Sequence, residues 1–144
     1  MTDGLSPKIV VDTNVLVSAL ISKSPETSSS RQLLRTCASG AFQPLISLAL
    51  FKEYEDVLSR PTVISLERRA ATEQILDGFV SLCEEVRIFF NLRPNLRDKA
   101  DNHVLELAIA GGAAYLVTHN LKDFTGELKF SRPQILTPRA LLEL

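Results

Sequence analysis

Hydrophobic residues in this chain of 144 residues occur in two patterns, as short continuous runs and as longer runs with helical spacing. The first short run, 9–11, contains two valines and suits a strand that is buried on both faces of a parallel sheet. Asp12 follows directly, and the apolar residues of 15–21 then continue as a helix. The pattern predicts a carboxylate at the carboxyl end of a first strand, although Asp12 could also serve only as the N-cap of the helix.

Strands and helices alternate along the rest of the chain. Further strands are predicted at 42–46, 84–90, 114–118 and 134–136, and further helices at about 30–39, 48–59, 65–82, 98–111 and from 137 onward. This alternation is typical of a three-layer α/β/α domain with a mostly parallel sheet, here of five strands. We find no repeat or linker, so one domain spanning 1–144 is predicted. Right-handed crossovers then bring Asp12 and Thr118, which follow two different strands, to the same edge of the sheet.

Charge, cysteine content and the length of apolar runs limit the binding partners and the cellular location that we expect for this protein. The formal net charge is -1, so any binding to nucleic acid must use a local basic patch. Cys37 and Cys83 are widely spaced in apolar surroundings, which favours free thiols over a disulfide. No apolar run is long enough to cross a membrane, and the first residues lack the features of a signal peptide. We therefore expect a soluble cytoplasmic protein.

The predicted helix at 98–111 carries a carboxylate in an unusual position. One face is apolar (Val104, Leu105, Ala108 and Ile109), and the opposite face is polar (Asn102, His103 and Glu106). Asp101 falls in the middle of the apolar face, where a lone charge costs several kcal/mol unless it is paired, protonated or bound to a metal. A place in the first turn, near the helix dipole, does not explain this inward position. Asp101 is therefore a candidate functional residue, and Asp98 is the predicted helix cap.

Two glutamates border the core in the predicted helix at 48–59. Glu53 and Glu55 flank its apolar stripe almost symmetrically, whereas Asp56 points away. Periodicity therefore excludes Asp56 but does not choose between the two glutamates, and either could also lie on a solvated helix edge.

Polar residues also follow the predicted strand at 114–118. Asn120 and Asp123 are either turn residues or part of a site at this edge of the sheet. We expect His119 to be an exposed loop residue rather than a metal ligand, because no second histidine has zinc-like spacing with it. If Asp12, Glu53 and Asp101 meet here with Asp123 or Asn120, they form an all-oxygen acidic cluster, which needs a cation to offset repulsion. Such ligands suit Mg²⁺ or Mn²⁺, and a metal held in this way supports hydrolysis of a phosphodiester.

Four segments in this order resemble the PIN-domain family of metal-dependent nucleases, most closely its branch of toxin components from bacterial toxin–antitoxin pairs. The segments are Val10–Val15, Ser47–Leu58, Asp101–Ala108 and Tyr115–Phe124, and the resemblance extends from Lys8 to about Leu142. It implies that Glu53 rather than Glu55 joins Asp12 and Asp101 at the metal, with Thr13 or Asn14 nearby. It also implies a five-stranded sheet, single-stranded RNA as the substrate, frequent homodimerisation and inhibition by a cognate antitoxin.

One departure from the family concerns the last segment. Many relatives carry an aspartate two residues after the threonine that corresponds to Thr118, whereas this chain has Asn120 there and an acid only at Asp123. The number of metals is therefore open, and a PIN fold that binds RNA or protein without cleavage is the alternative function. A dehalogenase-type phosphatase is disfavoured because Asn14 stands where its second aspartate is needed. The candidate RNA contacts are Lys23, Arg31, Lys52 and Lys122.

Overall fold

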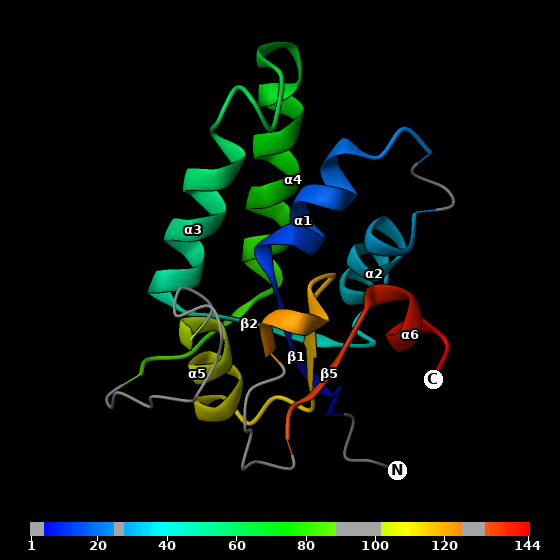
Figure 1. Cartoon of the computed structure of the whole chain (residues 1–144), viewed down its shortest axis with the longest axis vertical. Coiled ribbons are helices and arrows are strands. Elements are labelled where there is room, and N and C mark those ends of the chain that lie inside the picture. Colours follow the sequence, from blue (N-terminus) through cyan, green and yellow to red (C-terminus); the bar gives the residue numbers. More distant parts are fainter. Residues whose placement is uncertain (1–4, 25–27, 89–101, 125–131) are drawn as a thin grey trace.

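A computed structural model describes residues 5–24, 28–88, 102–124 and 132–144. Its core is a five-stranded sheet in which every neighbouring pair of strands is parallel, in the order β3-β2-β1-β4-β5 (Figure 1). The strands are β1 (Lys8–Val11), β2 (Gln43–Ile46), β3 (Glu84–Glu85), β4 (Tyr115–Val117) and β5 (Gln134–Leu136). Helices flank this sheet, so the predicted three-layer α/β/α arrangement is confirmed.

The helices follow the order predicted from the sequence. They are α1 (Thr13–Ile21), α2 (Ser29–Ala38), α3 (Leu48–Leu58), α4 (Arg69–Leu82), α5 (Asn102–Ala110) and α6 (Pro138–Leu142), with 3-10 turns at Leu66–Arg68 and Leu121–Phe124. Figure 1 shows α3 and α4 standing side by side as an upright pair. Because the connection from β3 to β4 runs back across the sheet, right-handed crossovers place α5 on the face opposite α1 and α2. Within the described ranges, no helix is long and apolar enough to span a membrane.

The order of the strands creates a switch point in the centre of the sheet. The chain moves outward from β1 through β2 to β3, then returns to place β4 and β5 on the other side of β1. Ligands of open α/β sheets bind outside the carboxyl ends of the strands at such a reversal. Asp12 follows β1 and Thr118 follows β4, and the Asp12 N–H donates to the Val117 carbonyl at 2.9 Å. The prediction that Asp12 and Thr118 share an edge is therefore confirmed.

The hydrophobic core and Tyr54 hold the carboxyl end of β1 in place. Ile9, Val10 and Val11 are fully buried, as expected for a strand covered on both faces. Tyr54 on α3 is also fully buried, and its hydroxyl donates to the Val11 carbonyl at 2.5 Å. This bond attaches α3 to the backbone one residue before Asp12.

The third strand differs from the prediction. It is shorter than the predicted 84–90, because β2 ends at Ile46, whose carbonyl accepts the last bond from the Val86 N–H at 2.8 Å. Residues 86–88 are not in a strand, and 89–90 lie outside the described residues. The start of the predicted helix at 98–101 also lies outside them. The predicted free thiols at Cys37 and Cys83 are confirmed.

Candidate active site

Among the carboxylates that the structure describes at the switch point, Asp12 is the most buried, with 4% of its surface exposed. Oδ1 accepts from the Thr13 N–H at 2.9 Å, so Asp12 does cap α1. Oδ2 accepts from the Thr118 hydroxyl at 2.8 Å and from the Asn14 side-chain amide at 3.2 Å. Capping and a functional role are therefore compatible, because all three of these donors are neutral and leave the charge of Asp12 uncompensated.

Thr118 and Asn14 hold the loop after β4 against the start of α1. The Thr118 hydroxyl oxygen accepts from the Asn14 amide at 3.2 Å and from the Asn120 N–H at 3.1 Å. The Asn14 side-chain oxygen accepts from the His119 N–H at 3.0 Å. These bonds bring the predicted supporting residues Thr118 and Asn14 to Asp12, whereas Asn120 takes part through its backbone.

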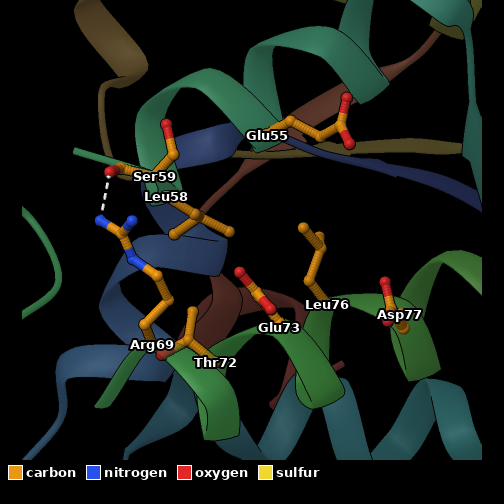
Figure 2. Close-up of a pocket in the computed structure, with 8 residues that line it drawn as sticks. All are labelled: Glu55, Leu58, Ser59, Arg69, Thr72, Glu73, Leu76 and Asp77. Carbon is orange, nitrogen blue, oxygen red and sulfur yellow. Dashed lines mark hydrogen bonds between the residues drawn. The ribbon is translucent and has the colours of Figure 1, made fainter. Parts of the chain in front are cut away.

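Glu53 joins three helices at the same edge. The Thr13 hydroxyl on α1 donates to Oε2 of Glu53, and Nε2 of His103 on α5 lies 3.0 Å from Oε1. The side chain of Glu53 is only 27% exposed. Glu55 is exposed and instead lines a separate pocket of about 270 Å³ between α3 and α4 (Figure 2). Of the two glutamates that periodicity left open, Glu53 is the one beside Asp12's neighbour Thr13.

The prediction for the polar face of α5 was wrong. His103 was expected to point away from the site, but its side chain is 26% exposed and contacts Glu53. Glu106 was expected on the same outer face and is 9% exposed. A signal for this second buried face was Leu107, an apolar residue one position after Glu106 and four after His103, which is fully buried. Periodicity assigned one inward face, whereas this side of α5 also meets α3.

Asp12 and Glu53 have opposite pKa shifts. Burial is the largest cause that raises the pKa of Asp12, and the negative charge of Glu53 adds to it, while bonds from Thr118 and Thr13 lower it. The hydrogen bond to His103 is the largest cause that lowers the pKa of Glu53. Carboxylates with perturbed pKa values that influence each other at a sheet switch point are typical of functional sites.

The other predicted acids do not complete a cluster in the described residues. Asp123 lies in the turn Leu121–Phe124, partly buried, and its N–H donates to the Asn120 carbonyl at 3.0 Å. Asp101 lies outside the described residues. In the part of the chain that the structure describes, no three His, Cys, Asp or Glu side chains come together as metal ligands. The roles of Asp101 and Asp123 therefore stay predictions.

The loop residues around the site occupy mixed environments. His119 is exposed, as expected, but its Nε2 lies 3.0 Å from the Ser30 hydroxyl. Of the predicted RNA contacts, Arg31 is partly buried and donates through Nε to the Ala19 carbonyl at 3.0 Å. The three lysines, Lys23, Lys52 and Lys122, are exposed. Their contacts with RNA stay predictions.

Comparisons with known proteins agree with this geometry. Residues 8–122 match the family described as PIN domain. No curated protein matches the chain. A similar solved structure is a chain in the crystal structure of VapBC2 from Rickettsia felis bound to a DNA fragment from their promoter, with a TM-score of 0.57 and 20% identity. The match covers 90% of this chain and 96% of that chain. At this identity, the structural likeness concerns the fold alone.

Proposed function

The chain belongs to the PIN-domain family, and on that premise we propose that it is a divalent-metal-dependent ribonuclease that cleaves single-stranded RNA as the toxin of a toxin–antitoxin pair. Members of the family are generally nucleases. The observation that carries the proposal is the buried carboxylate of Asp12 at the sheet switch point, held by neutral donors beside a second carboxylate, Glu53.

The chemistry of this donor set fits a hard divalent cation. Asp12 and Glu53 offer carboxylate oxygens, and burial and mutual repulsion both oppose the ionised form of Asp12. A cation would relieve both effects, and oxygen ligands favour Mg²⁺ or Mn²⁺. We propose that Asp12 and Glu53 hold it together with Asp101 and Asp123. Such a cation supplies Lewis acidity toward a phosphodiester and offsets charge on the leaving oxygen.

The surrounding residues have distinct tasks in this proposal. Thr118 and Asn14 fix the orientation of Asp12 by donating to the same oxygen, Oδ2. Thr13 and His103 fix Glu53 by binding one oxygen each, and His103 favours its ionised form. Asn120 and Asp123 shape the loop after β4, and Asp123 would act on a bound cation through a water.

The partners follow from the same premise. The similar solved complex contains VapBC2 and promoter DNA, which is a property of that complex. We propose that this chain pairs with its own antitoxin protein and forms a homodimer. Its RNA substrate would contact Lys23, Arg31, Lys52 and Lys122 through phosphates, since the net charge of -1 provides no general attraction.

The proposal is tested by cleavage of a single-stranded RNA by the purified protein with Mn²⁺ and with EDTA. We expect cleavage only with Mn²⁺, and we expect Glu53→Gln to lose about a hundredfold or more of the rate, because metal-based charge stabilisation contributes several kcal/mol. Glu55→Gln is the matched control, since it removes the same charge from the same helix at an exposed residue of the separate α3–α4 pocket, and it should cleave at the wild-type rate.

The alternative, a PIN fold that binds without cleavage, gives a different result. It predicts no Mn²⁺-dependent cleavage by the wild-type protein, while RNA or a partner protein still binds. Cleavage by Glu53→Gln at the same, wild-type rate as Glu55→Gln would show that Glu53 has no role in the site.

A further inference from the structure

A pocket of about 600 Å³ opens beside the candidate active site. It lies between the start of α3, the residues that follow β3, and α5. His103 belongs to both places, because it lines this pocket and contacts Glu53. The volume falls within the range of small-molecule sites, so the pocket has room for one nucleobase and part of its ribose.

Glu106 gives this pocket an unusual chemical feature. It is 9% exposed and lines the pocket, yet it makes no hydrogen bond or ion pair with the described residues. The residue as a whole is largely buried, but its carboxylate oxygens are not, so they are open to the pocket. Because the described residues supply no donor to these oxygens, a ligand in the pocket can supply the donors in place of water. An ionised carboxylate is an acceptor only, with two oxygens side by side, so its best partner presents two adjacent donors.

The walls of the pocket suit a flat ring attached to phosphate. Leu48, 64% exposed, lines it together with Val86 and Ile88, which supplies apolar surface for a base. Lys52 and Arg87 are exposed on its lining and form no ion pair among the described residues. Proteins that recognise single-stranded RNA place bases against such surfaces and read their Watson–Crick edges.

We propose that this pocket binds a guanine base of the RNA substrate, with Glu106 accepting hydrogen bonds from guanine N1–H and from its exocyclic N2 amino group. Adenine and cytosine present one amino donor beside a ring-nitrogen acceptor, and uracil presents one N–H between two carbonyls. Each of these places an acceptor against a carboxylate oxygen. Guanine alone offers two neighbouring donors on this edge. The inference rests on the proposed function, since it names the substrate base of the same site.

The test is binding of mononucleotides in EDTA, which needs no cleavage. Dissociation constants for 5′-GMP, AMP, CMP, UMP and IMP are measured by NMR titration. We expect GMP to bind about tenfold or more tightly than AMP, CMP and UMP, since a hydrogen bond to a charged group is worth about one decade in affinity. IMP lacks the N2 amino group, so it should bind about tenfold more weakly than GMP.

A variant then assigns the preference to Glu106. Glu106→Gln keeps the shape but replaces one acceptor oxygen with a donor, so it should remove the preference for GMP. Glu73→Gln on α4 makes the same charge change at the separate α3–α4 pocket of Figure 2 and should keep it.

Equal binding of GMP and IMP to the wild-type protein would overturn the inference, even if Glu106→Gln does not fold. Preserved GMP preference in folded Glu106→Gln would overturn it too. RNA cleavage without a guanine preference would contradict this inference alone, whereas GMP preference without RNA cleavage would contradict only the proposed function.

Discussion

Asp12 combines good hydrogen bonding with poor charge compensation. Its oxygens accept from Thr13, Asn14 and Thr118, and none of these groups carries a charge. Hydrogen bonds satisfy the lone pairs but only partly offset the loss of water around a buried carboxylate. The fold therefore holds Asp12 in a fixed orientation, while burial disfavours its ionised form.

This imbalance predicts a pH dependence of stability. The pKa of Asp12 is raised from its ordinary value of 3.8, so the folded protein retains a proton that the unfolded chain has already lost. The contribution of Asp12 to the free energy of unfolding therefore falls as pH rises from about 4 through the raised pKa. In Asp12→Asn this loss is absent. Denaturant unfolding in EDTA should show the stability of Asp12→Asn relative to wild type increasing over that range, and parallel pH profiles would contradict the account.

Single residues also mark the limit of sequence-based prediction. Asp12 was identifiable because it directly follows the apolar run 9–11, and the right-handed crossover rule places the end of that strand at the ligand-binding edge of the sheet. The choice of Glu53 over Glu55 was not available from helical spacing, because it depends on how α3 is rotated against Thr13 and His103. The inward positions of His103 and Glu106 were missed because helix periodicity describes one packed face, and α5 has contacts on two.

Among the elements, the start of α6 and the end of α2 were predictable from their own residues. Thr137 accepts from the Ala140 N–H at 3.2 Å and precedes Pro138, as its cap-and-proline pattern indicates. Gly40 has a φ of 90° just after α2, where the sequence placed a stop. The short β3 could not be predicted, because an apolar run does not reveal where the neighbouring strand ends.

Gly111 tests how closely α5 approaches the sheet. A Cβ at Gly111 would lie 2.5 Å from Leu45 Cδ1 and 3.1 Å from Val86 Cγ2, and Leu45 is fully buried. Gly111→Ala should therefore lower the free energy of unfolding by about 1–3 kcal/mol through overpacking. Gly78 in the middle of α4 has nothing within 4 Å of a Cβ. Gly78→Ala should raise stability by about 0.5–1 kcal/mol. Denaturant unfolding measures both, and the same sign for the two variants would refute this packing argument.

At the scale of the whole molecule, the sheet order brings residues from distant parts of the chain to one edge. Asp12, Glu53 and Thr118 meet because the chain reverses direction across the sheet between β3 and β4. The alternation of strands and helices was enough to predict that Asp12 and Thr118 share this edge, but not that Glu53 joins them. The pattern does not establish which basic side chains lie around this edge, because exposed lysines leave no periodic signal in the sequence.

The salt dependence of RNA binding tests the contribution of these basic side chains. Asp12→Asn protein is used so that the RNA stays intact. Adding Lys52→Ala should reduce the slope of log affinity against log salt by about 0.7, the value for one phosphate contact to a single strand. Lys8→Ala is the control, because Lys8 begins β1 at the opposite edge and pairs with Glu84 at 3.3 Å. An unchanged slope for Lys52→Ala would remove Lys52 from the RNA contacts.

We propose above that the Asp12 carboxylate holds a divalent cation that drives RNA cleavage. The most direct test of this proposal is the rate of single-stranded RNA cleavage by Asp12→Asn and wild type at saturating Mn²⁺, with folding of both verified by thermal unfolding. The account predicts a rate at least about a hundredfold lower for Asp12→Asn, because the loss of metal-based stabilisation amounts to several kcal/mol. Cleavage by folded Asp12→Asn at the wild-type rate would contradict it.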